Sequence, residues 1–131
     1  MKMKSNFDKV VEFSRAMGVS VFPDSPAKDE DINLASGLIV EELQEFAQEE
    51  PNTAQELKEL CDLLYVAYGY GARIGYDMNT AFNLVHASNM SKLGDDGKPI
   101  YREDGKVLKG PNYTPPDLTN CLPTHTQIVN N

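Results

Sequence analysis

Residues 54–74 constrain the fold most, because apolar side chains cover most of the circumference of the helix predicted there. Thr53 is expected to cap this helix, and Glu56 completes the pattern of a capping box. A helix that is apolar nearly all round is normally central and buried. In a chain of only 131 residues, such a helix needs more cover than three neighbouring helices provide. We therefore expect a helical homo-oligomer, either a dimer or a tetramer.

Three further helices follow from apolar residues at helical spacing. The first covers about residues 6–17, with Ser5 as its cap, and the second covers about residues 30–49. The last runs from the capping residue Asp77 to about residue 90. Short loops between these helices favour an all-α, four-helix antiparallel bundle.

The chain changes character after Leu93, where Gly, Pro and Asp become frequent. We predict a helical catalytic domain over residues 1–93 and an irregular C-terminal extension over residues 94–131. Ile100–Arg102 and Lys106–Leu108 flank a Gly-containing turn and predict a short β-hairpin. The last dozen residues are expected to form a mobile tail.

The composition suits a cytoplasmic globular protein that binds neither nucleic acid nor membranes. Hydrophobic residues make up 40% of the chain, yet no stretch approaches the roughly 18 consecutive apolar residues of a membrane span. The N-terminal lysines are not followed by the apolar core of a signal peptide. Cys61 and Cys121 match no metal or disulfide pattern and are expected to be reduced thiols. The net charge of −8 opposes binding to nucleic-acid backbones, which needs clustered Lys and Arg.

Acidic residues carry the chemistry that this sequence suggests. They form the motif EExxE at 41–45 and the motif ExxD at 59–62, each inside a predicted helix. Residues three apart on a helix lie on adjacent turns, about 60° apart around the axis. Glu42 and Glu45 therefore point the same way, and so do Glu59 and Asp62. Pairing of the two helices would bring these four carboxylates face to face.

Carboxylates at such close range repel one another, and two outcomes relieve the repulsion. Some carboxyl groups take up protons with a raised pKa, or a divalent cation lies between them. Oxygen ligands without His or Cys favour Mg²⁺, with Mn²⁺ as a substitute, and suit phosphate chemistry. A di-iron bundle is disfavoured because it needs Glu-x-x-His pairs, and His86 and His125 fit structural or solvated roles. The remaining alternative is that these glutamates only form solvated helix surfaces.

In combination, the motifs resemble those of the MazG-like all-α nucleoside triphosphate pyrophosphohydrolases. The similarity covers about residues 5–116 and includes Val-Val-Glu-Phe-Ser-Arg-Ala-Met-Gly near the N-terminus, Gly-Tyr-Asp before the last helix and Ser-Asn-Met-Ser-Lys at its end. The tail is similar to that of small stand-alone bacterial and phage members. Relatives include the phosphoribosyl-ATP pyrophosphohydrolases and the dimeric dUTPases. In this family, water attacks the α-phosphorus and pyrophosphate is released.

The resemblance implies a role for each motif residue. The four carboxylates shared by the two motifs would bind Mg²⁺: Glu42, Glu45, Glu59 and Asp62. Glu41 would orient or deprotonate the attacking water. Asn89 and Lys92 would contact the phosphates or the sugar, and Arg73 is the other helical cation available to a triphosphate. Family members are dimers or tetramers, in agreement with the expected homo-oligomer.

Three functions stay open at this point. We favour a pyrophosphohydrolase that removes unwanted or surplus (deoxy)nucleoside triphosphates. The second is a relative with a narrow substrate, such as phosphoribosyl-ATP or dUTP. The third is a non-catalytic acidic helical module that binds another protein. Mg²⁺-dependent release of pyrophosphate separates the third function from the first two, and a substrate panel separates those two.

Overall fold

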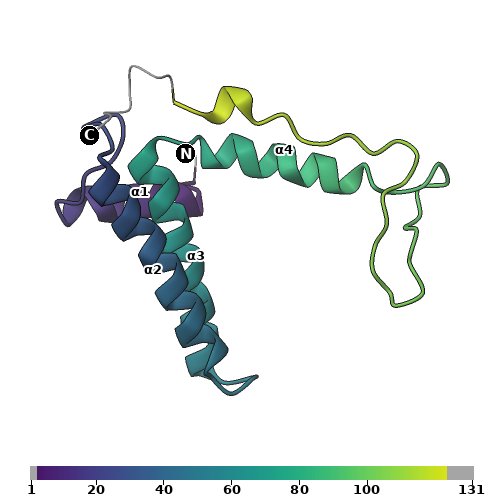
Figure 1. Cartoon of the computed structure of the whole chain (residues 1–131), viewed down its shortest axis with the longest axis horizontal. Helices are drawn as coiled ribbons and strands as arrows, with labels where there is room; N and C mark the ends of the chain where they lie inside the picture. Colours follow the sequence, from purple (N-terminus) through teal and green to yellow (C-terminus); the bar gives the residue numbers. More distant parts are fainter. Residues whose placement is uncertain (1–2, 124–131) are drawn as a thin grey trace. The chain divides into compact units, whose positions relative to one another are not determined.

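The computed structural model describes residues 3–123 and is all-α (Figure 1). Its helices are α1 (Asn6–Ala16), α2 (Asp29–Ala47), α3 (Ala54–Ile74), α4 (Met78–Met90) and the short 3-10 helix η1 (Thr119–Cys121). The predicted all-α class with four α-helices is thus confirmed, and the predicted bounds differ from these by one or two residues. No helix in the described range is long and apolar enough to cross a membrane. His125, and most of the tail expected to be mobile, lie outside the described residues.

The chain divides into two compact units. The first comprises Met1–Met78 together with residues 122–131, and the second comprises Asn79–Cys121. The second unit therefore takes in nearly all of α4 as well as the segment that follows it. The division into sequence domains at residue 93 stays a prediction.

Local side-chain caps start α1 and α3 where the sequence predicts them. The Ser5 hydroxyl accepts a hydrogen bond from the Asp8 backbone N–H, and the Asp8 carboxylate accepts one from the Ser5 N–H, which completes the capping box. At α3, the Thr53 hydroxyl accepts from the Glu56 N–H, as expected. The Glu56 carboxylate, however, accepts from the N–H of Asn52 rather than that of Thr53. Only half of the predicted capping box therefore forms at α3.

In the first unit, α2 and α3 pack side by side as an antiparallel pair, and α1 packs on α3 (Figure 1). The contact between α1 and α3 is aromatic. Phe7 lies 6.1 Å from Tyr68, and Phe13 meets Tyr65 edge-to-face at 5.5 Å, both measured between ring centroids. The buried core is built from small and β-branched residues of the helices and of the loop before α2: Val10, Val21, Ala27, Ala35, Ala72 and Ile74.

The C-terminal end of α3 depends on two glycines. Gly75 ends the helix in the left-handed conformation at φ 94°, and a Cβ there would lie 2.6 Å from the Phe22 ring. A Cβ on Gly71 would lie 2.5 Å from the Met78 side chain. Both positions therefore let a bulky side chain reach the backbone of α3, which is the close approach expected of glycines in this helix.

Within the described part of the first unit, α1 and α2 cover only part of the circumference of α3, so the expected burial of α3 is not reached there. Large apolar side chains on the α2–α3 pair are exposed: Leu34, Leu38, Leu43, Leu57, Leu60 and Leu64. Exposed apolar surface of this extent is typical of an interface.

In the second unit, hydrogen bonds fasten the segment after α4 back onto the end of that helix. The Ser88 hydroxyl donates to the Thr114 carbonyl, and the Gly110 N–H donates to the Lys92 carbonyl at 2.8 Å. The predicted hairpin is present as a single antiparallel bridge between Tyr101 and Val107. This pairing is too short to form regular strands.

Candidate functional site

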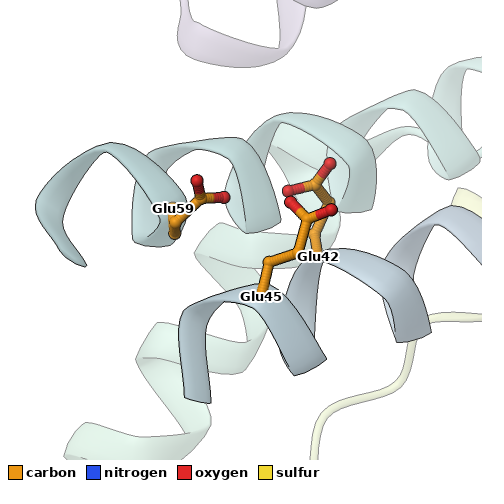
Figure 2. A group of neighbouring side chains, drawn as sticks. All are labelled: Glu42, Glu45 and Glu59. Atoms are coloured by element: carbon orange, nitrogen blue, oxygen red, sulfur yellow. The ribbon is translucent and has the colours of Figure 1, made fainter. Parts of the chain in front are cut away.

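The α2–α3 pair brings three carboxylates of the two acidic motifs together. Glu42 and Glu45 extend from adjacent turns of α2, and Glu59 extends from α3 into the same space (Figure 2). One carboxylate oxygen from each of the three lies within 4.8 Å of the other two. The predicted facing of the two helices therefore holds for these residues, because the short turn between α2 and α3 places their acidic stripes opposite each other.

Two oxygens of this acidic cluster (Glu42, Glu45 and Glu59) are buried without a hydrogen-bond partner among the described residues. They are Oε2 of Glu42 and Oε2 of Glu59. Glu59 is only 5% exposed, which is unusual for a glutamate. A buried carboxylate oxygen without a partner is costly in free energy, and either a proton or a cation would lower that cost.

Repulsion within the cluster raises the pKa of Glu45. The negative charge of Glu42 raises the pKa of the Glu45 carboxyl above its ordinary value of 4.5, with smaller contributions from desolvation and from Glu59. This is one of the two outcomes expected for crowded carboxylates, namely a shift toward the protonated form. A bound divalent cation would reverse that shift.

Asp62, the fourth predicted metal ligand, pairs with a lysine and is not part of the cluster. Its Oδ2 lies 2.7 Å from Lys58 Nζ, an i,i+4 pair on α3. The same ammonium lies 3.7 Å from Glu59 Oε1, which also accepts a hydrogen bond from the Gln55 side chain at 2.7 Å. The carboxylate of Asp62 raises the pKa of Lys58. The sequence predicted no role in the site for Lys58 and Gln55. Their spacing of four residues from Asp62 and Glu59 could have predicted these two contacts.

The other predicted site residues lie apart from the cluster or in the second unit. Glu41 is exposed on α2, one turn before Glu45. Arg73 pairs with Asp31 at 3.3 Å and is 12% exposed, roughly 21 Å along α3 from Glu59. It shares a helix stripe with Glu59 but not a position along the axis, so the structure does not bring it to the cluster. Asn89 and Lys92 belong to the second unit, at the end of α4 and just after it.

A cavity of about 700 Å³ lies at the opposite end of α3 from the cluster. Three aromatic side chains line it, those of Phe7, Phe22 and Tyr76. Its wall on α3 begins at Gly71, roughly 18 Å along the helix from Glu59. The cavity is therefore not part of the acidic site.

The donor set of the cluster fits a hard divalent cation. It offers carboxylate oxygens from two helices, two of which are buried and lack a partner. Mg²⁺ binds in proteins through a few carboxylates and keeps its remaining positions for water or substrate phosphates. Three of the four predicted ligands therefore form a group that fits Mg²⁺, whereas Asp62 lies outside it, and Mg²⁺ binding itself stays a prediction.

A comparison with protein families gave a match that includes the helices of the acidic cluster. Residues 10–89 match the family model of phosphoribosyl-ATP pyrophosphohydrolase. The chain belongs to this family. The matched segment contains the whole acidic cluster together with Asp62 and Asn89, and it ends before Lys92. A comparison with curated proteins gave no match.

Family membership confirms part of what the motifs predict. It places the chain among the all-α pyrophosphohydrolases, so at the coarse level it is a hydrolase that cleaves a phosphoanhydride bond of a nucleotide.

Proposed function

We propose that this chain is a Mg²⁺-dependent pyrophosphohydrolase that converts (deoxy)nucleoside triphosphates into nucleoside monophosphates and pyrophosphate, and so removes unwanted or surplus nucleotides. The observation that carries the proposal is the acidic cluster itself: three carboxylates within 4.8 Å, with a buried and unpartnered oxygen on Glu42 and on Glu59. Such a cluster is unfavourable for a metal-free role and well suited to a cation that binds phosphates.

Each acid has a defined part in this proposal. Glu42, Glu45 and Glu59 would hold Mg²⁺ together with Asp62. When bound, Mg²⁺ offsets negative charge on the phosphates. Glu41 accepts a proton from the attacking water, a role that its exposed position one turn before Glu45 supports. The water oxygen forms a bond to the α-phosphorus, the bond from that phosphorus to the bridging oxygen breaks, and pyrophosphate leaves.

The sequence also singles out residues for binding the substrate. Asn89 and Lys92 contact the phosphates or the sugar. Arg73 was expected to assist them, but its ion pair with Asp31 supports a role in joining α2 to α3 instead. We also propose that the protein works as a homodimer or homotetramer, since exposed leucines on α2 and α3 would be covered by a second copy. We propose the cytoplasm as its location.

Phosphoribosyl-ATP is the second candidate substrate, and the family match favours it. It carries a further phosphate beyond the triphosphate, which needs further cations. Basic residues of the described first unit are mostly engaged in ion pairs, as for Lys4 with Glu12, Arg15 with Asp24 and Lys58 with Asp62. Among these described ion pairs only that of Lys58 lies against the acidic site, and this small number of nearby cations supports the simpler triphosphates as substrates.

A substrate panel tests the proposal. The purified protein is incubated with each dNTP, each NTP and phosphoribosyl-ATP, with Mg²⁺ or with EDTA, and the products are separated by anion-exchange chromatography. We expect a monophosphate and pyrophosphate from at least one simple triphosphate, and no turnover in EDTA. Turnover of phosphoribosyl-ATP alone would support the second candidate. Release of orthophosphate, or no turnover of any substrate, would contradict the proposal.

A further inference from the structure

Lys58 lies against the acidic site and has no assigned part in the proposed reaction. Its ammonium is 2.7 Å from Asp62 Oδ2 and 3.7 Å from Glu59 Oε1. It therefore contacts Glu59 of the cluster and Asp62, a motif acid outside the cluster. The Lys58 side chain is 62% exposed, so the ammonium can leave these partners for water at little cost.

The contacts of Lys58 are confined to one side of the site. Glu59 Oε1 receives both the Lys58 ammonium and the hydrogen bond from Gln55, whereas Glu59 Oε2 stays without a partner. Oε2 of Glu42 is likewise unpartnered. The ammonium thus neutralises the outer part of the acidic site and leaves the buried oxygens free for another cation.

The positive charge of Lys58 has opposite effects on the stability of the metal-free site and on metal binding. Without metal, it reduces the repulsion among the carboxylates and stabilises the fold. When a divalent cation enters, the ammonium repels it and competes with it for the carboxylate of Asp62. Lys58 therefore weakens metal binding while it stabilises the metal-free site.

From this geometry we infer that Lys58 is a built-in counter-ion of the metal-free acidic site, which competes with the divalent cation for Asp62 and Glu59. The inference rests on the metal site of the proposed function. It makes Lys58 a positioning residue whose removal tightens metal binding. A residue needed only for folding would do the opposite.

Calorimetric titration of the full chain with Mn²⁺, without nucleotide, tests this role. We expect Lys58→Gln to bind Mn²⁺ about two- to fivefold more tightly than wild type, the scale of an exposed ion pair. Lys58→Arg keeps the positive charge and should bind as wild type does. Lys28→Gln is the matched control, because it removes the same charge roughly 20 Å along α2 from Glu42. Without metal, Lys58→Gln should also melt at a lower temperature than Lys28→Gln.

The outcomes separate this inference from the proposed function. Tighter binding in Lys58→Gln alone supports the counter-ion role. Unchanged or weaker binding in Lys58→Gln overturns it, while metal binding and pyrophosphate release by the wild type keep the proposed function intact. A wild-type protein that binds no Mn²⁺ and releases no pyrophosphate would overturn both.

Discussion

At the scale of single residues, Glu41 and Glu42 are neighbours in the chain with different surroundings. They project about 100° apart around α2, so Glu42 turns toward α3 and is half-buried while Glu41 is exposed. We expect Glu41→Gln to lower kcat by at least about 10²-fold, the usual scale for losing a general base, with Mn²⁺ binding unchanged. Steady-state kinetics and calorimetry of the same preparation measure both. A near-normal kcat would remove Glu41 from the proposed mechanism.

The raised pKa of Glu45 leads to a pH-dependent prediction for the metal-free protein. Because the folded state raises this pKa above 4.5, chiefly through the charge of Glu42, ionised Glu45 lowers stability at neutral pH. That cost is absent below the ordinary pKa and appears as the pH rises through the raised value. Glu45→Gln should therefore melt at a higher temperature than wild type at pH 7 in EDTA, and this advantage should shrink toward pH 4.5.

Two comparisons make the Glu45 measurement specific. Glu50→Gln removes a charge from the exposed turn after α2 and should show a smaller and less pH-dependent effect. In excess Mg²⁺ the order should reverse, since the wild type then gains a ligand–metal contact that Glu45→Gln lacks. A melting difference that stays constant from pH 4.5 to 7 would contradict the repulsion between Glu42 and Glu45.

Helix periodicity explains why the sequence predicted all three acids of the cluster, although it also placed Asp62 with them. A spacing of three residues places Glu42 and Glu45 on one side of α2, and a short turn forces α2 and α3 to pair. Periodicity does not say which carboxylate a nearby cation selects. Lys58 engages Asp62 through an i,i+4 pair, and this competition between neighbours on one helix was not evident from the motif alone.

At the scale of elements, Gly110 holds the segment after α4 against the end of that helix. A Cβ on Gly110 would lie 2.5 Å from the Leu93 carbonyl oxygen and 2.6 Å from that of Lys92, both of which are backbone atoms that cannot move aside easily. Gly110→Ala should cost about 1–3 kcal/mol, as expected for overpacking. Thermal denaturation followed by circular dichroism measures this loss.

Gly37 provides a control in which the same substitution should raise stability instead of lowering it. It lies inside α2, and a Cβ there would meet no atom within 4 Å. Gly37→Ala should therefore stabilise the protein by about 0.5–1 kcal/mol, through the helix propensity of alanine. A Gly110→Ala protein as stable as wild type would contradict the close packing of Gly110 on the Lys92–Leu93 backbone.

Element boundaries were predictable where a side chain marks them, as Ser5 and Asp8 do for α1. The sequence was a poorer guide to which side chains lie at the same level along two paired helices. Arg73 lies on the same stripe of α3 as Glu59, yet four helical turns separate them, and Asp31 on α2 pairs with Arg73 at that level. A stripe fixes direction around the axis but does not fix which partner a side chain meets.

At the scale of the whole molecule, the exposed leucines of α2 and α3 bear on assembly. Leu57 is 61% exposed and Leu64 is 54% exposed, although both lie on the helix that the sequence marks as most apolar. We expect a homodimer or homotetramer by size-exclusion chromatography with light scattering, and a shift toward monomer in Leu64→Glu. A wild-type protein that is monomeric at about 50 μM would contradict this expectation, because an obligate apolar interface stays assembled at that concentration.

The central claim is that the acidic cluster between α2 and α3 binds a divalent cation. Calorimetric titration of Mn²⁺ into wild type, Glu59→Gln and Glu50→Gln tests it most directly, with circular dichroism to verify folding. Glu59 is the buried acid of the cluster, and Glu50 is a nearby exposed acid outside it. We expect wild type and Glu50→Gln to bind alike, and Glu59→Gln to bind at least about tenfold more weakly, since even outer partners of metal ligands contribute that much. A folded Glu59→Gln protein that binds Mn²⁺ as tightly as wild type would contradict the claim.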